Sequence, residues 1–320
     1  ENIVHPVHIL YCFFINNRAY IRMHRGGTGG AVYMLTSNFI NNCSSYVNNT
    51  SEKAGGAIHL TDTSHFKNVL CKFFNNVALQ KGGSIYFSKN DPGLYNMTNM
   101  LSEFTSNKAA DGGAIYIKAV TRMLNYRTTF HMNRGSNRGG SLYIFELDHL
   151  YNKYSIFQYN FAKQDGGSMC LEQVLHVQIF NGKDIGNIAE KNSGGALHMN
   201  LVKHIMIKSS KFLHNRAAQG GTIYVKSSEE MSINTCSFHE NWSNLDGGAL
   251  CTLRLDNLHI TACYYLKDKA IAGDGGAGVI KHSKIVIVEF SKFINCTAKI
   301  AANFYIQSSG RVVVGKDKFY

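Results

Sequence analysis

Residues 130–144 read FHMNRGSNRGGSLYI, and this stretch holds the two short motifs from which the chain is built. The first motif is an aromatic residue followed three positions later by asparagine, here Phe130 and Asn133. The second is a Gly-Gly pair, a small residue and then alternating apolar residues, here beginning at Gly139. Both motifs recur along the chain, so the fold follows from a repeat rather than from any single segment.

The Gly-Gly motif occurs ten times at nearly constant spacing. Successive copies are 26, 27, 30, 27, 27, 28, 26, 27 and 28 residues apart, and a degraded copy stands at Ala301 and Ala302. The pairs begin at Gly29, Gly55, Gly82, Gly112, Gly139, Gly166, Gly194, Gly220, Gly247 and Gly275. Such regular spacing predicts a stack of equivalent units.

The aromatic motif keeps the same period and follows the Gly-Gly pair by 18 residues in most units. Its aromatic positions are Phe14, Tyr46, Phe73, Phe104, Phe130, Phe157, Phe212, Phe238, Tyr265 and Phe293. In the irregular seventh unit the register predicts Ile185 at the aromatic position and Ile188 at the asparagine position. Asp268 and Cys296 are further exceptions at the asparagine position. A serine, threonine or cysteine usually stands two residues before the aromatic residue.

This unit of about 27 residues alternates apolar and polar residues and lacks a long 3.6-residue pattern, which predicts short strands joined by turns. Propeller blades usually need about 40 residues, so one turn of a parallel β-helix fits better. Parallel crossovers favour a right-handed coil. We therefore predict an all-β fold, a right-handed parallel β-helix (solenoid) of about eleven turns and roughly 50 Å, with extra loops near residues 18–28 and 88–98.

Each motif position has an expected place in this coil. Apolar residues three and five places after the first glycine, such as Ile115 and Ile117, should point inward and form the core. The glycine pair should supply a positive φ or a close approach at a corner. The aromatic residues should stack, the asparagines should form amide ladders or turns, and the Ser and Thr column should form bonds between turns.

The pairing of GGA(I/L) with FxxN over about residues 12–304 resembles the repeat of the chlamydial polymorphic outer-membrane proteins, which also occurs in large surface proteins of other microbes and of protists. The resemblance implies an extracellular or cell-surface right-handed β-helix that acts in adhesion or as a structural element. It implies no enzyme activity.

Residues 1–320 are expected to form a single parallel β-helix domain that is a segment of a longer chain or fibre. Both ends continue the strand pattern, as in residues 311–314, and show no polar cap. The expected partners are other copies or neighbouring segments of the same β-helix, surface glycans, or host or cell-surface proteins.

The main alternative is a carbohydrate-active β-helix, a polysaccharide lyase or hydrolase with clustered charged residues on one outer face. The recurring acids Asp111, Asp165, Asp246 and Asp274 each precede a Gly-Gly pair, where aspartate is a common turn residue. We therefore expect turn geometry instead of catalysis. Phosphate-binding glycine loops and zinc-spaced Cys or His clusters are absent from the sequence, so neither a cofactor nor a metal is expected.

The net charge of +12 favours acidic partners, yet the basic residues are scattered singly and form no run of five. We interpret them as solvated surface and expect no specific nucleic acid partner. No stretch approaches the roughly 18 to 20 apolar residues of a membrane helix, so no membrane span is expected in this chain.

Four tyrosines share the outward position four residues after the first glycine: Tyr86, Tyr116, Tyr143 and Tyr224. They predict an exposed aromatic stripe on one face, which would suit glycan stacking or a protein contact. The alternative is cross-strand stacking that only stabilises the sheet.

Two further sets of residues are candidates for modification. Asn48, Asn96 and Asn295 are the preferred sequons for N-glycosylation. Cys236 and Cys263 stand at equivalent positions of adjacent units, where Cα atoms about 4.8 Å apart lie within disulfide range. A bridge between them is predicted, with buried free thiols as the alternative.

Overall fold

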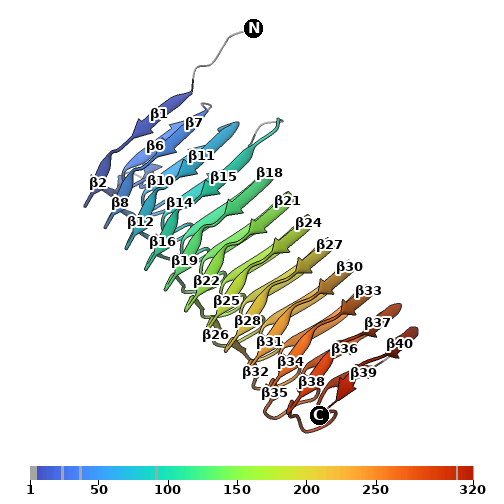
Figure 1. Cartoon of the computed structure of the whole chain (residues 1–320). Coiled ribbons are helices and arrows are strands. Elements are labelled where there is room, and N and C mark those ends of the chain that lie inside the picture. The colour runs from blue at the N-terminus through green and yellow to red at the C-terminus, as the bar shows by residue number, and fades with distance from the viewer. Residues whose placement is uncertain (1–5, 23–24, 36–37, 91–92, 308, 320) are drawn as a thin grey trace.

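The computed structural model describes residues 6–22, 25–35, 38–90, 93–307 and 309–319 as a long stack of short strands (Figure 1). Within these residues every strand pair is parallel except the hairpin of β4 (Ile21–Arg22) and β5 (Arg25–Gly26), and no helix is present. The predicted parallel β-helix is confirmed. One of its sheets has ten strands in the described ranges, so the stack has about ten turns, close to the predicted eleven. The right-handed sense of the coil stays a prediction.

The first sheet contains the residues that follow each Gly-Gly pair. In the middle turns this side is one strand of 12 residues, and in the outer turns it is two shorter strands. The strands of the first sheet are β1 (Val7–Leu10), β6 (Val32–Leu35), β7 (Phe39–Asn42), β10 (Ile58–Thr61), β11 (His65–Val69), β14 (Ile85–Ser88), β15 (Asn96–Met100), β18 (Ile115–Tyr126), β21 (Leu142–Lys153), β24 (Met169–Phe180), β27 (Leu197–Lys208), β30 (Ile223–Asn234), β33 (Leu250–Thr261), β36 (Gly278–Lys281), β37 (Ile285–Glu289), β39 (Phe304–Gln307) and β40 (Arg311–Gly315).

The second sheet carries the aromatic motif. Its strands are β2 (Phe13–Ile15), β8 (Ser45–Val47), β12 (Lys72–Phe74), β16 (Glu103–Thr105), β19 (Thr129–His131), β22 (Ile156–Gln158), β25 (Lys183–Ile185), β28 (Lys211–Leu213), β31 (Ser237–His239), β34 (Tyr264–Leu266), β38 (Lys292–Ile294) and β41 (Lys318–Phe319). The third sheet follows it in each turn. Its strands are β3 (Arg18–Ala19), β9 (Thr50–Ser51), β13 (Val77–Ala78), β17 (Lys108–Ala109), β20 (Arg134–Gly135), β23 (Phe161–Ala162), β26 (Ile188–Ala189), β29 (Arg216–Ala217), β32 (Trp242–Ser243) and β35 (Lys269–Ala270).

Two longer loops lie where the sequence predicts them. Residues 18–28 contain the β4–β5 hairpin, and the segment after Ser88 connects β14 to β15. Residues 23–24 and 91–92 of these loops lie outside the described residues.

Apolar side chains fill the interior of the coil as predicted. Ile115 and Ile117 are fully buried and pair in register with Leu142 and Ile144 on the next turn. Neighbouring rings of the aromatic column stack face to face with centroids 4.5–5.0 Å apart. Burial of each such side chain stabilises the fold by about 1.5–3 kcal/mol.

The seventh unit lies one residue away from the predicted register. Asp184, and not Ile185, pairs with Phe157 and Phe212 in the aromatic column. Its carboxyl group is fully buried and accepts a hydrogen bond of 2.9 Å from the Ser168 hydroxyl. Burial raises the pKa of Asp184 to about 7.

The asparagine ladder runs from Asn17 to Asp268 through the third position after each aromatic residue. Asn187, and not Ile188, holds this position in the seventh unit. Each asparagine donates its backbone N–H and one side-chain N–H to the Oδ1 atom of the next member, with side-chain distances of 2.8–3.2 Å. From Asn49 onward the other side-chain N–H donates to a backbone carbonyl, as from Asn107 to Phe73 at 3.0 Å. Because all these donors are satisfied, the amides can be buried without a large desolvation cost.

A second asparagine ladder, which the sequence analysis missed, lies in the first sheet. It consists of Asn41, Asn68, Asn99, Asn125 and Asn152, whose side-chain amides are joined by hydrogen bonds of 2.6–2.9 Å. Farther along the stack, residues such as Ile179 and Ile207 take the same inward position. The Ser and Thr column also forms bonds between turns, as where the Ser102 hydroxyl accepts from the Cys71 N–H.

The two glycines of each pair are required for different reasons. The first glycine of every pair has a φ of 56–69°, a left-handed conformation that a side chain disfavours. The second glycine approaches the next turn so closely that an added Cβ would collide with a carbonyl oxygen, as between Gly140 and Gly167. The degraded copy keeps the left-handed corner at Ala301, which has a φ of 53°.

We expect Gly140→Ala to destabilise the protein by about 2 kcal/mol or more, because the new methyl group forces neighbouring turns apart. Gly315→Ala is the matched control, since an added Cβ there meets nothing within 4 Å. Urea denaturation followed by circular dichroism measures both. Equal midpoints for the two variants would contradict the close-approach role of the second glycine.

Asp268 predicts a pH dependence of stability. Its Oδ1 accepts from the backbone and side-chain N–H groups of Asn241, both at 2.9 Å, while its buried Oδ2 has no hydrogen-bond partner among the described residues. Burial raises the pKa of Asp268 to about 8, although the Asn241 bonds oppose this shift. In the unfolded chain the pKa is about 4, so between pH 4 and 8 the folded state holds more protons and stability falls as the pH rises.

We expect Asp268→Asn to remove the fall in stability that Asp268 causes as the pH rises. The asparagine keeps an Oδ1 atom that accepts the hydrogen bonds from Asn241. The variant should be more stable than the parent by at least about 1 kcal/mol at pH 8, with a difference that shrinks toward pH 4. Urea midpoints measured from pH 4 to 9 test this, with the exposed Glu103→Gln as control. A parent as stable as the variant at pH 8 would rule out the burial of an unfavourable charge.

Candidate ligand-binding surface

One outward column of the first sheet runs beside the Gly-Gly corners, and we call it the seam column. Its members pair in register on successive turns. They are Tyr33, His59, Tyr86, Tyr116, Tyr143, Cys170, His198, Tyr224, Cys251, Val279 and Tyr305. All four tyrosines predicted to share a face therefore lie in this column.

The structure brings three of these tyrosines together and separates the fourth. Tyr116 stacks on Tyr86 and on Tyr143, with ring centroids 5.3 and 5.1 Å apart. Tyr224 lies three turns beyond Tyr143 and stacks on His198 at 5.3 Å. The cross-strand stacking considered as the alternative is thus present.

The expectation of an exposed aromatic stripe is wrong for three of the four tyrosines. Tyr116, Tyr143 and Tyr224 are only 5%, 4% and 8% exposed. Cations from the corners cover the rings: Lys81 Nζ lies 4.8 Å from the Tyr116 centroid, and Arg138 Cζ lies 4.5 Å from that of Tyr143. Burial accordingly raises the pKa of Tyr116 to about 12. Ligand binding by these four residues stays a prediction.

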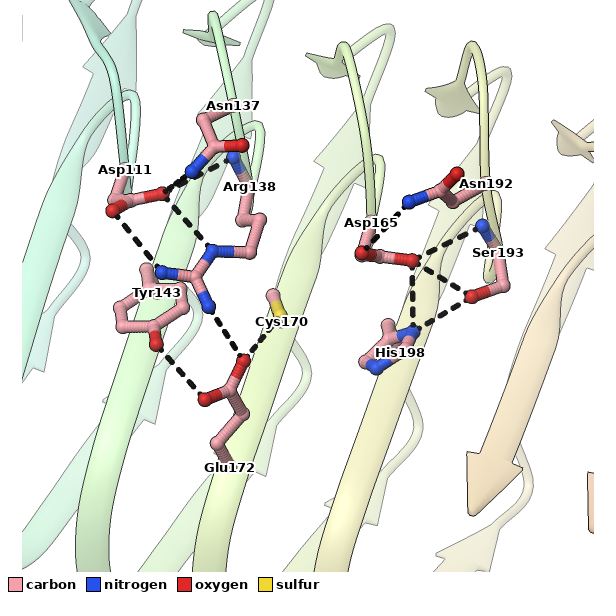
Figure 2. Close-up of polar contacts among 10 residues, drawn as sticks. All are labelled: Asp111, Asn137, Arg138, Tyr143, Asp165, Cys170, Glu172, Asn192, Ser193 and His198. Atoms are coloured by element: carbon pink, nitrogen blue, oxygen red, sulfur yellow. Dashed lines mark hydrogen bonds and ion pairs between the residues drawn. The ribbon is translucent and has the colours of Figure 1, made fainter.

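A polar network around Arg138 ties three turns together (Figure 2). The guanidinium contacts Asp111 Oδ1 at 3.3 Å on the preceding turn and Glu172 Oε1 at 2.8 Å on the following turn. Tyr143 completes the network by donating its hydroxyl hydrogen to Glu172 Oε2 at 3.0 Å. The network therefore holds the corner over the buried tyrosine rings.

Farther along the same seam, Asp165, Ser193 and His198 form a second network (Figure 2). The Ser193 hydroxyl donates to Asp165 Oδ1 at 2.8 Å, and His198 Nδ1 lies 2.9 Å from Ser193 Oγ and 3.3 Å from Asp165 Oδ1. A hydrolase triad needs the hydroxyl and the carboxylate on opposite ring nitrogens, whereas here both face Nδ1. Burial alone would raise the pKa of Asp165, but the bonds from His198 and its neighbours lower it to about 2. The group therefore acts as a structural clamp.

The aspartates before the Gly-Gly pairs hold the next turn, as the turn-geometry interpretation expects. Asp111 Oδ1 accepts the backbone N–H of Arg138 at 3.3 Å, and Asp246 Oδ1 accepts that of Asp274 at 3.1 Å. Asp165 does the same for Ser193 at 3.2 Å. In each case donor and acceptor lie at the same register on neighbouring turns.

Two open grooves lie along the seam. A groove of about 590 Å³ is lined by Lys53, Lys81 and His59, and one of about 410 Å³ by Lys191 and Lys226. Burial lowers the pKa of His59 to about 4, so this imidazole is neutral at pH 7 and the lysines supply the charge. The first groove is thus lined by lysine ammonium groups, whereas the second also carries the Asp165 carboxylate.

A histidine ladder on the first sheet was missed in the sequence analysis. His149, His176 and His204 stack on consecutive turns with centroids 4.7 and 4.9 Å apart. Burial together with the neighbouring imidazoles lowers the pKa of His176. The spacing of 27 and 28 residues, the same as the repeat, was the signal that could have revealed this ladder. Within the described ranges, no three His, Cys, Asp or Glu side chains are placed to hold a metal ion.

The three predicted sequons occupy different environments. Asn48 and Asn295 are exposed at left-handed corners with φ values of 55° and 50°. Asn96 is half-buried at the start of β15, and its side chain lies 3.3 Å from His65 Nδ1. Glycosylation of these residues stays a prediction.

The fold and the surface columns define the molecule as a parallel β-solenoid whose charged and aromatic side chains mainly bind turn to turn. The described part of the chain has no helix with the length and apolar character needed to cross a membrane. Residues 102–118, from β16 into β18, match the Chlamydia polymorphic membrane protein repeat. The resemblance seen in the motifs is therefore confirmed, and the parallel β-solenoid is consistent with a polymorphic outer-membrane repeat protein. Comparison with curated proteins and with solved structures found no match.

Cys236 and Cys263 lie at the same register on adjacent turns, and both are buried thiols in the structure. Their mutual hydrogen bond and burial raise the pKa of Cys263, while the same hydrogen bond lowers the pKa of Cys236. The predicted bridge remains compatible with this register in an oxidising environment.

Mass spectrometry of unreduced peptides from protein purified without reductant should find Cys236 linked to Cys263. Cys263→Ser, which introduces the residue common in this column, should leave Cys236 available to alkylation after unfolding. Finding both residues alkylated in unreduced wild-type protein would contradict the bridge.

Proposed function

We propose that this protein is an extracellular or cell-surface β-solenoid that acts as an adhesive or structural element. The polymorphic membrane protein repeat suggests a surface or outer-membrane protein, which supports this location. The observation that carries the proposal is the register of the stack. Because residues about 27 positions apart align on the outside, the rod presents long columns of side chains at equivalent positions, a geometry suited to extended partners.

The proposal assigns no enzymatic step to the chain. Its support is the engagement of the recurring acids: Asp111, Asp165 and Asp246 accept backbone N–H groups and pair with neighbouring side chains. A carboxylate bound in this way is poorly placed to serve as a general acid or base toward a polysaccharide.

The end turns support contact with further β-helical turns, of another copy or of a neighbouring segment. Val314 pairs with the buried Val288 of the preceding turn, yet on the last described turn it is itself 51% exposed. Exposed strand edges with apolar side chains favour the addition of another strand. We include end-to-end association in the proposal for this reason.

Adhesion can be tested with beads coated with the purified chain and applied to cultured epithelial cells and to a glycan array. We expect retention at least tenfold above that of beads carrying the same chain unfolded in urea before coupling. Light scattering on the soluble protein should show species larger than the monomer.

The same preparation is incubated with pectate, alginate and hyaluronan, and the release of reducing ends is measured. No release is expected. Turnover of any of these polymers together with background bead retention would replace the adhesive function with a carbohydrate-active one. A strictly monomeric protein would remove the end-to-end part of the proposal.

A further inference from the structure

The outward side chains of the third sheet form one column in which basic residues recur. The column reads Arg18, Thr50, Val77, Lys108, Arg134, Phe161, Ile188, Arg216, Trp242 and Lys269 along the stack. We call its five cations, Arg18, Lys108, Arg134, Arg216 and Lys269, the basic ladder. The sequence scatters these residues singly, and the fold aligns them.

The charge of the basic ladder is not neutralised within the column. All five side chains are exposed, and the column contains no carboxylate. Among the described residues, the ion pairs of the protein involve other cations, such as Arg138, Lys281 and Lys284. Positive charges arranged in a line without counter-charges in the column attract a polyanion strongly.

Aromatic neighbours hold two of the arginines in place. Arg216 Cζ lies 3.7 Å from the centroid of Trp242 on the next turn, and Arg134 Cζ lies 4.5 Å from that of Phe161. A guanidinium stacked on a ring keeps its N–H edges free for bidentate bonds to sulfate or carboxylate. Because the stacking fixes the side chains beforehand, less conformational entropy is lost when an anion binds.

The geometry of the basic ladder is that of a line rather than a pocket. At about 4.8 Å per turn, the six turns from Lys108 to Lys269 span roughly 29 Å. Within the stretch from Lys108 to Lys269, Lys108 and Arg134 lie on adjacent turns at one end, and Arg216 and Lys269 lie two turns apart at the other. Arg18 lies apart from this stretch, three turns before Lys108. A ligand that engages both ends must therefore be an extended chain with anionic groups along its length.

We propose that the basic ladder binds a linear acidic polysaccharide carrying sulfate or carboxylate groups. This inference rests on the proposed surface function, for which it names the partner. A single-stranded nucleic acid fits less well, since its bases need open aromatic faces and the arginines cover one face of Trp242 and of Phe161.

The test uses the whole chain and heparin, measured by fluorescence anisotropy with labelled fragments of graded length. The ladder variant is K108Q/R134Q/R216Q/K269Q. The matched control is K72Q/K183Q/K211Q/K318Q, which removes the same charge from exposed positions of the second sheet. Circular dichroism melting curves verify that both variants fold.

At about 150 mM salt we expect the ladder variant to bind heparin at least tenfold more weakly and the control less than threefold. The ladder variant should also lose steepness in the dependence of affinity on salt, since fewer counterions are released. Fragments shorter than roughly 29 Å should bind wild type more weakly than longer ones.

Three results would overturn the inference. Equal losses of heparin affinity in both variants would show that net charge alone attracts the polymer. A wild-type protein with no affinity for heparin would contradict binding of an acidic polysaccharide. A single-stranded oligonucleotide of the same length and charge that competes as well as heparin would assign the ladder to nucleic acid. If heparin fails while coated beads still adhere to cells, the inference falls and the proposed function stands.

Discussion

The close approach of neighbouring turns at the second glycine of each pair is the constraint on which the rest of the structure depends. A carbonyl oxygen occupies the place that a Cβ would take, so only glycine allows the corner to close. Once every corner closes in the same way, each turn must repeat the register of the last. Equivalent positions then lie above one another, so that rings stack on rings and side-chain amides form hydrogen bonds with amides. The long columns are a consequence of the corner.

Because equivalent positions stack on one another, each buried column accepts some substitutions easily and others only at a cost in stability. Asn152 gives way to Ile179 in an inward column because both fill similar space, although the amide ladder ends there. Asp184 and Asp268 are harder to accommodate, since burial opposes their ionisation. They remain because a protonated carboxyl group can still accept the hydrogen bonds that these positions require.

The sequence predicted the parallel β-helix, its apolar and aromatic inward columns and a corner at the glycine pair, because these follow from a repeat that can be counted. It failed where a side chain's surroundings come from other turns. The register of the repeat put Ile185 in the aromatic column, whereas Asp184 pairs there, and Tyr143 was expected on the surface although Arg138 from the corner covers it. The cations of the basic ladder are scattered singly in the sequence. Their alignment becomes visible only when the repeat period is used to compare outward positions as well as inward ones.

At Ala302 a single methyl group changes the last Gly-Gly-type corner of the stack. Its methyl group stands at the register where each preceding turn has the second glycine, and Gly276 already lies against its carbonyl oxygen. A turn added over this corner in the same register would press its own carbonyl into that methyl group. One carbon atom thus changes the corner that the ten glycine pairs share. Any further turn over this corner would have to depart from the register that the glycine pairs set.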